Sequence, residues 1–307
     1  MLAATEKRNP AGPTIDRLDP AEAVAELVDA QRQAAGAVAN AAPSLLRAAQ
    51  AIAGAISAGR RVIYCGAGSS GLMALADTLE LPGTFGIAPD RAFALIAGGL
   101  ASLSDLAGGY EDDARAGGDD LRASGLSAGD CVIVVAASGR TLYALGAAEA
   151  ARTADAIVIA IANNAGTPLL GLADIPILLA TPPEPLAGST RLGAGTAQKI
   201  ALNTISTMAG VLLGHVHDGM MVNVRADNAK LRERAARIVG TIAQVGEDAA
   251  RAALGETGGA VKLAILVARG ASGREDAERR LVEAKQNLRV AIDALVQKKD
   301  SRRPHRA

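Results

Sequence analysis

The chain has 307 residues, half of them hydrophobic, and its 32 basic and 32 acidic residues give a formal net charge of zero. This length can bury a large core, and the charge balance gives no electrostatic footprint for nucleic acid or for an acidic membrane surface. Apolar runs are too short to span a bilayer and residues 1–13 are polar, unlike a signal peptide, so we expect a cytoplasmic protein.

The first part of the chain is expected to form two helices and a strand. Asp19-Pro20 combines a capping residue with a first-turn proline, which predicts a helix over residues 20–41. Pro43 begins a second helix that ends near Gly59. Residues 61–65 then form a short run of β-branched and aromatic residues that stops at Gly66, the pattern of a buried strand.

The same strand pattern occurs four more times, over residues 92–97, 131–137, 156–162 and 175–180. Helical stretches separate most of these runs. Continuous apolar strands alternating with helices are typical of a parallel sheet covered on both faces. The sequence therefore predicts a three-layer α/β fold with a five-stranded parallel sheet, in which a ligand binds beyond the carboxyl ends of the strands.

From Thr196 onwards the chain is expected to be helical, with long helices over residues 196–213 and 227–242 and a small bundle of three or four short helices over residues 246–297. We expect helices in residues 1–60 that pack on a central domain of residues 61–245, a helical domain of residues 246–298 and a disordered tail of residues 299–307. The apolar helices after Thr196 exceed what a five-stranded sheet needs, which favours a dimer.

The turn after the first strand, Gly66-Ala67-Gly68-Ser69-Ser70-Gly71, begins a helix and fits the dinucleotide pattern G-x-G-x-x-G. The next strand, however, ends Ile96-Ala97-Gly98-Gly99, without the acidic residue that holds a ribose. The turn also lacks the lysine of a P-loop and the G-x-S-x-G elbow of a hydrolase. It is therefore either a tight turn capped by serine or a binding site for a phosphate monoester at a helix N-terminus.

Two further helix N-termini have the same chemistry. Ser138-Gly139-Arg140-Thr141 follows the third strand and includes an arginine, which binds phosphate oxygens bidentately. Gly188-Ser189-Thr190-Arg191 precedes the long helix that contains Lys199. Three such segments favour phosphosugar binding over helix capping alone. The candidate binding residues are Gly68, Ser69, Ser70, Ser138, Gly139, Arg140, Thr141, Ser189, Thr190, Arg191 and Lys199.

Carboxylates are the candidate acid–base groups. His215 and His217 are two residues apart, a spacing that does not put them on one helix face, and we expect no metal site. Glu80 and Glu111, each viewed alone, would be solvated surface residues. We place Glu80 just beyond the helix that follows the first glycine turn. Flanking leucines and a Pro-Gly turn there would bury it partly and raise its pKa towards the range of a general acid.

An ordered series of segments is more specific than any single glycine motif. Its members are Thr5-Glu6-Lys7-Arg8-Asn9-Pro10, Ile15-Asp16, Ile63-Tyr64-Cys65-Gly66-Ala67-Gly68, Glu80-Leu81-Pro82-Gly83-Thr84-Phe85-Gly86, Ile96-Ala97-Gly98-Gly99, Glu111-Asp112-Asp113, Ala136-Ala137-Ser138-Gly139-Arg140-Thr141, Gly188-Ser189-Thr190-Arg191-Leu192, residues 194–199 and Asn203-Thr204-Ile205-Ser206-Thr207. This series, over nearly the whole chain, resembles the N-acetylmuramic acid 6-phosphate etherase family, whose members have the flavodoxin-like sugar isomerase (SIS) fold. The chain departs from the family at Leu72 and Gly193, where members usually have arginine and lysine.

The resemblance implies a carbon–oxygen lyase of peptidoglycan recycling, which removes the lactyl ether of N-acetylmuramic acid 6-phosphate to give N-acetylglucosamine 6-phosphate and D-lactate. It implies elimination followed by addition of water, with no metal or organic cofactor. Glu80 would then protonate the departing lactate, and Glu111 would be its acid–base partner. Homodimers whose active sites draw on both subunits are also implied. The alternatives are an isomerase or lyase for a related phosphosugar, and a non-catalytic phosphosugar sensor.

Overall fold

The computed structural model describes residues 4–9, 12, 14–104 and 108–300, apart from the side chains of residues 298–300. The chain forms two compact units, Met1–Leu79 with Pro89–Ala209 and Glu80–Ala88 with Gly210–Ala307. The domain borders expected at residues 60, 245 and 298 stay a prediction, and residues 301–307 of the expected tail lie outside the described residues. No helix in the described part of the chain is long and apolar enough to cross a membrane.

The first unit contains a parallel sheet of five strands. These are β1 (Val62–Gly66), β2 (Ala92–Ile96), β3 (Cys131–Val135), β4 (Ile157–Ala162) and β5 (Ile175–Leu178), in the order β2-β1-β3-β4-β5. β1 and β3 are buried along their whole length, as a parallel sheet between two helical layers requires. The predicted five-stranded parallel sheet is confirmed, and its strand order is the flavodoxin-like one.

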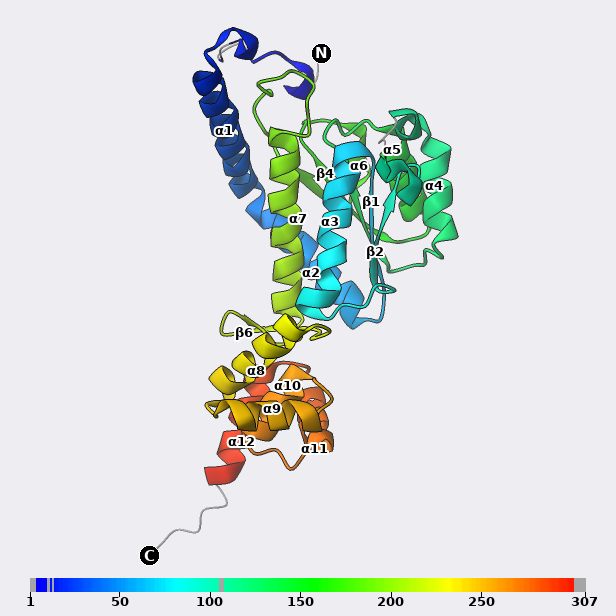
Figure 1. Ribbon diagram of the computed structural model, residues 1–307. Coiled ribbons are helices and arrows are strands. Elements are labelled where there is room, and N and C mark those ends of the chain that lie inside the picture. The colour runs from blue at the N-terminus through cyan, green and yellow to red at the C-terminus, as the bar shows by residue number, and fades with distance from the viewer. Residues whose placement is uncertain (1–3, 10–11, 13, 105–107, 301–307) are drawn as a thin grey trace, which may run out of the picture. The chain divides into compact units, whose positions relative to one another are not determined.

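Helices cover both faces of this sheet (Figure 1). On one face, α4 (Ala114–Ala123), α5 (Leu142–Thr153) and α6 (Pro168–Leu172) pack over a core of small and β-branched side chains that includes Val132, Val134, Ala144, Ala147 and Leu169. The other face carries α2 (Ala42–Ser57), α3 (Gly68–Phe85) and α7 (Gly193–Leu212). Alanines on α5 let the helix approach the strands closely, which compensates for the scarcity of aromatic residues.

The N-terminal helices agree with the expectation. Two short 3₁₀ turns, η1 (Ala4–Glu6) and η2 (Ile15–Arg17), precede α1 (Pro20–Ala37). The Asp19 side chain accepts a hydrogen bond from the Ala21 N–H at 2.9 Å, so the predicted cap is confirmed. A 3₁₀ turn, η3 (Val38–Ala41), then leads into α2.

The end of α3 differs from the prediction. Placing Glu80 beyond this helix was wrong, because α3 continues through Pro82 to Phe85 and Glu80 lies in its fourth turn with an exposed side chain. Pro82 usually marks a helix end because it lacks an N–H. Here the helix ends at Gly86 instead, whose φ of +65° suits a glycine that follows a helix and whose N–H donates to Pro82 O at 3.1 Å.

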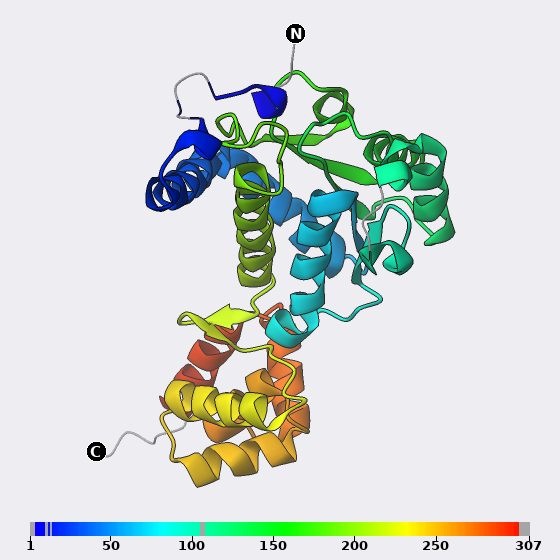
Figure 2. The same ribbon diagram turned by 45° about the horizontal axis from the view of Figure 1, so that its top comes forward.

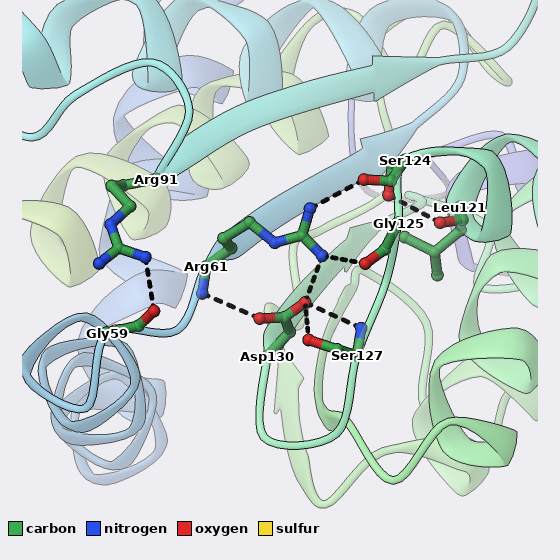
Figure 3. A network of polar contacts seen from close by, with 8 residues as sticks. All are labelled: Gly59, Arg61, Arg91, Leu121, Ser124, Gly125, Ser127 and Asp130. Atoms are coloured by element: carbon green, nitrogen blue, oxygen red, sulfur yellow. Dashed lines mark hydrogen bonds and ion pairs between the residues drawn. The ribbon is translucent and has the colours of Figure 1, made fainter.

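An ion pair between the half-buried Arg61 and the buried Asp130 joins the amino ends of β1 and β3 (Figure 3). Arg61 donates to Asp130 Oδ2 at 2.7 Å and to the carbonyls of Ser124 and Gly125. Burial alone would raise the pKa of Asp130, but hydrogen bonds from Arg61 and Ser127 hold that pKa below its ordinary value. The pair therefore stabilises the strand ends as a charged pair.

The second unit is largely helical. After α7 comes a short hairpin whose strands, β6 (Val216–His217) and β7 (Met220–Met221), have two residues each. The helices that follow are α8 (Ala229–Ala243), α9 (Glu247–Glu256), α10 (Val261–Ala268), α11 (Arg274–Glu283) and α12 (Leu288–Asp300). The six residues at the start of α10 are all buried, so this helix forms the centre of the unit. The expected bundle of short helices is confirmed, whereas the hairpin was not predicted.

Candidate active site

Two of the three hydroxyl-rich segments begin side by side. Gly66 at the end of β1 pairs with Val135 at the end of β3, so the turns that follow these strands start next to each other. The helices after the two turns, α3 and α5, cover opposite faces of the sheet. In open α/β sheets this topological switch point is where ligands bind. The structure thus brings Gly68, Ser69 and Ser70 together with Ser138-Gly139-Arg140-Thr141.

The turn after β3 presents hydroxyl groups at the start of α5. Ser138 Oγ accepts the Arg140 N–H at 3.1 Å and lies 3.4 Å from Thr141 Oγ1. Gly139 has a φ of +63°, and a β-carbon there would collide with Thr167. Thr141 is the N-cap residue of α5, yet its side chain makes no capping hydrogen bond. A helix N-terminus whose N-cap hydroxyl does not cap the helix, with the exposed Arg140 nearby, suits a small dianion.

Glu111 contributes a carboxylate at the switch point. It lies in η5 (Gly108–Asp112) with a half-buried side chain. Its Oε1 lies so close to the position of a β-carbon on Gly68 that the two would collide, so the carboxylate lies directly against the first residue of α3. Burial, and then the neighbouring charge of Asp112, raise the pKa of Glu111 above its ordinary value. A carboxylate with a raised pKa beside a glycine turn at a helix N-terminus is suited to proton transfer.

The start of α7, the third segment, is occupied by a side chain of the protein itself. Glu184, which is 2% exposed, accepts hydrogen bonds from the N–H groups of Gly193 and Ala194 at 2.9 and 2.8 Å. These backbone N–H groups are thus not available to a phosphate. The start of α7 therefore differs from the starts of α3 and α5, although the sequence predicts the same chemistry for all three. The candidate residues before this terminus are the half-buried Ser189 and Thr190 and the exposed Arg191. That their side chains bind the phosphosugar stays a prediction.

Lys199, the last of the candidate cations, belongs to a polar network between α7, α3 and β1. Its Nζ donates to Asn203 Oδ1, and the Asn203 amide donates to Asp77 Oδ1 at 2.6 Å. Asp77, which is 4% exposed, also accepts from Ser206 at 3.0 Å and from Tyr64 at 3.0 Å. Burial and then Asp77 raise the pKa of Tyr64, which keeps its hydroxyl protonated as a donor.

Glu80 and Glu111 belong to different compact units. In α3, Glu80 comes 12 residues after Gly68. The pairing of the two carboxylates therefore stays a prediction. His215 and His217 are in the second unit, where burial and then Lys262 lower the pKa of His215 to about 4. Among the described residues, no group of three or more His, Cys, Asp or Glu could hold a metal ion.

Sequence reasoning missed the buried polar residues that arrange this site. Asp77 and Glu184 lie in stretches of mixed polarity, and neither has a partner at a spacing that a local motif would reveal. The one available signal for Asp77 is its position on a helix face that otherwise turns apolar residues towards the sheet. Such residues become recognisable only when their partners from other elements are known.

Comparison with known proteins gives a consistent picture. Residues 28–163 match the SIS domain family. An N-acetylmuramic acid 6-phosphate etherase from Deinococcus radiodurans is 45% identical over 94% of this chain and 94% of that protein. The protein of the same name from Rubrobacter xylanophilus is 40% identical over 94% of this chain and 95% of its own length.

Among solved structures, a phosphoheptose isomerase from Francisella tularensis is 23% identical, with a TM-score of 0.48 over 64% of this chain and 98% of that one. The sequence relatives are similar over almost their whole length, including both compact units. The chain therefore belongs to the N-acetylmuramic acid 6-phosphate etherase family.

Proposed function

We propose that the protein is a carbon–oxygen lyase that cleaves the D-lactyl ether of N-acetylmuramic acid 6-phosphate, giving N-acetylglucosamine 6-phosphate and D-lactate. The names of the relatives support this substrate. Within the molecule, the observation that carries the proposal is the Glu111 carboxylate against Gly68, at the switch point between two hydroxyl-rich turns. The reaction belongs to the recycling of peptidoglycan sugars, and because phosphorylated sugars are cytoplasmic metabolites we place it in the cytoplasm.

The phosphate is proposed to bind at the starts of α3 and α5. Ser69, Ser70, Ser138 and Thr141 supply hydroxyl donors there, and the two helix dipoles favour negative charge. Arg140 is exposed beside them and adds a charge-assisted hydrogen bond. With the phosphate held at the ends of β1 and β3, the sugar ring extends towards Glu111.

The chemistry requires two groups in opposite protonation states. A base removes the proton on C2, the bond from C3 to the lactyl oxygen breaks, and an acid gives a proton to the departing lactate oxygen. Water then adds across the double bond between C2 and C3, which returns a proton to C2 and a hydroxyl to C3. Glu111, with its raised pKa, is proposed as the group that exchanges the C2 proton, and Glu80 as the acid that protonates lactate.

We also propose a homodimer in which the partner subunit supplies Glu80. The exposure of Glu80 leaves its carboxylate accessible to a second chain, and exposed apolar side chains on α1 and α7, such as Val24, Val28, Val211 and Leu212, are candidates for burial in the interface. Light scattering at micromolar concentration is expected to give twice the chain mass. A monomer mass would remove the shared-site part of the proposal.

The function is tested by incubating the protein with N-acetylmuramic acid 6-phosphate and following the reaction by proton NMR. The expected result is the methyl signal of free lactate together with N-acetylglucosamine 6-phosphate. Turnover of another phosphosugar without lactate would favour an isomerase. Binding of phosphosugars without any turnover would favour a sensor.

A further inference from the structure

The amino-terminal segment, residues 4–9, lies at the carboxyl edge of the sheet, beside the loop that precedes α7 (Figure 2). Its residues Glu6, Lys7 and Arg8 are exposed, as expected for a charged segment. Thr5, which directly precedes them, is only 1% exposed. A single deeply buried polar residue in an otherwise solvated segment indicates a specific anchoring contact.

Thr5 is anchored by Asn164, which follows β4. The Asn164 amide donates to Thr5 Oγ1 at 3.0 Å, and the Thr5 N–H donates back to Asn164 Oδ1 at 3.3 Å. Asn164 is itself 5% exposed, and its amide nitrogen also donates to Ala137 O at 3.0 Å. Ala137 is the residue before Ser138, so this pair of hydrogen bonds reaches the turn that begins α5.

Thr5 also contacts the segment that begins at Gly188. The Gly188 N–H donates to Thr5 O at 2.9 Å. Ser189, Thr190 and Arg191 follow directly. Thr5 therefore connects two of the three candidate binding segments, which are about 50 residues apart in sequence. Its hydroxyl is linked through Asn164 to the residue before Ser138, and its carbonyl accepts from Gly188, the residue before Ser189.

We propose that Thr5 is a positioning residue of the phosphosugar site. It holds the Ser138–Thr141 turn, through Asn164, in a fixed relation to the Ser189–Arg191 segment. The inference rests on the proposed function, and it assigns no contact between Thr5 and the substrate. Because binding groups have to be held within a fraction of an ångström, loosening this relation is expected to weaken phosphosugar binding more than it slows the bound substrate.

The test uses the full chain with Thr5→Val, which keeps the shape and removes the hydroxyl, and Thr5→Ser, which keeps the hydroxyl. Isothermal calorimetry with N-acetylglucosamine 6-phosphate measures affinity, and lactate release measures KM and kcat. Thr5→Val is expected to raise both Kd and KM about tenfold with a smaller change in kcat, while Thr5→Ser stays near the parent. Thr153→Val is the matched control, because Thr153 is an exposed threonine at the far end of α5.

A second variant, on the other side of the contact, tests the same inference if Thr5→Val is poorly folded. Asn164→Ala, which also removes the hydrogen bond to Ala137 O, is expected to weaken binding by at least as large a factor. Adding Thr5→Val to Asn164→Ala should change binding little, since the contact between the two side chains is already lost. If Thr5→Val melts at a lower temperature but binds and turns over like the parent, Thr5 is a structural anchor only and the inference is wrong. A parent protein that binds the phosphosugar without releasing lactate would contradict the proposed function, and the calorimetry would still decide the role of Thr5.

Discussion

The carboxylate of Glu111 lies directly against Gly68, in the space that a side chain on Gly68 would occupy. Gly68 also has a φ of +51°, which other residues adopt only with strain. The glycine at this position thus allows both the turn into α3 and the approach of a carboxylate to the switch point. Replacing it tests whether this placement of Glu111 matters for function.

Gly68→Ala is expected to displace Glu111 and to reduce lactate release by at least about tenfold, with a loss of about 1–2 kcal/mol in stability from the left-handed backbone. Gly83→Ala is the matched control in the same helix, because nothing lies within 4 Å of its β-carbon position. That change should leave activity intact and stabilise the protein by about 0.5–1 kcal/mol. Equal activity in both variants would show that Glu111 need not contact Gly68.

The pH dependence should reflect the raised pKa of Glu111. If deprotonated Glu111 takes the C2 proton, kcat/KM falls at low pH with a midpoint above the ordinary glutamate pKa. Asp112→Asn removes the neighbouring negative charge and should move the midpoint to lower pH. A profile that is unchanged by Asp112→Asn would count against Glu111 as the titrating group.

The raised pKa of Glu111 also predicts that removing its charge does not destabilise the protein at neutral pH. Because the folded-state pKa is above the unfolded-state value, the contribution of Glu111 to stability is full below the unfolded-state pKa and is lost as pH rises through the folded-state pKa. Glu111→Gln removes this charge, so at pH 7 the variant should be at least as stable as the parent in urea unfolding. A marked loss of stability would mean that the charged carboxylate has a favourable partner.

Glu184 is expected to contribute to stability through the start of α7. Glu184→Ala removes an acceptor for two backbone N–H groups, and the loss should be about 2 kcal/mol or more. Glu184→Gln keeps one acceptor oxygen and should lose less. Urea unfolding at pH 7 measures both variants. A neutral Glu184→Ala variant would show that other groups or water satisfy this helix terminus.

The ion pair at the other end of the sheet provides a contrast between stability and function. Arg61→Leu leaves the buried Asp130 without its cation and should destabilise the protein by about 3–5 kcal/mol. Its kcat at a temperature where it remains folded should match that of the parent, because the pair lies at the amino ends of the strands. Lost activity in the folded variant would contradict this separation.

The sequence predicts the sheet well because each strand is a continuous apolar run that ends at a glycine or polar turn. Since parallel strands have their carboxyl ends at one edge, the same runs also place the turns after Gly66 and Val135 at one edge. That these two turns are neighbours follows from the strand order, which the structure supplies. The position of Glu80 was not predictable in this way. Pro82-Gly83 is a strong local turn signal, but packing keeps α3 helical as far as Phe85.

The contacts between distant residues could not be predicted from local patterns. Thr5 and Asn164 are separated by most of the first unit, and each is an ordinary polar residue in its own segment. Asp77 and Glu184 likewise gain their partners only when α3, α7 and the preceding loop pack together. The hairpin of the second unit did have a local signal, the Asp218-Gly219 turn with positive φ values, which is typical of two-residue hairpins.

The most direct test of the central claim follows the C2 proton and the lactate in one experiment. N-acetylmuramic acid 6-phosphate is incubated in D₂O with the parent, Glu111→Gln and Glu80→Gln proteins, and NMR records deuterium at C2 together with free D-lactate. The parent should release lactate and give product with deuterium at C2. Glu111→Gln should slow both, whereas Glu80→Gln should stop lactate release and still exchange the C2 proton. Parent-like lactate release from the Glu111→Gln protein would contradict the assignment of the active site to the switch point.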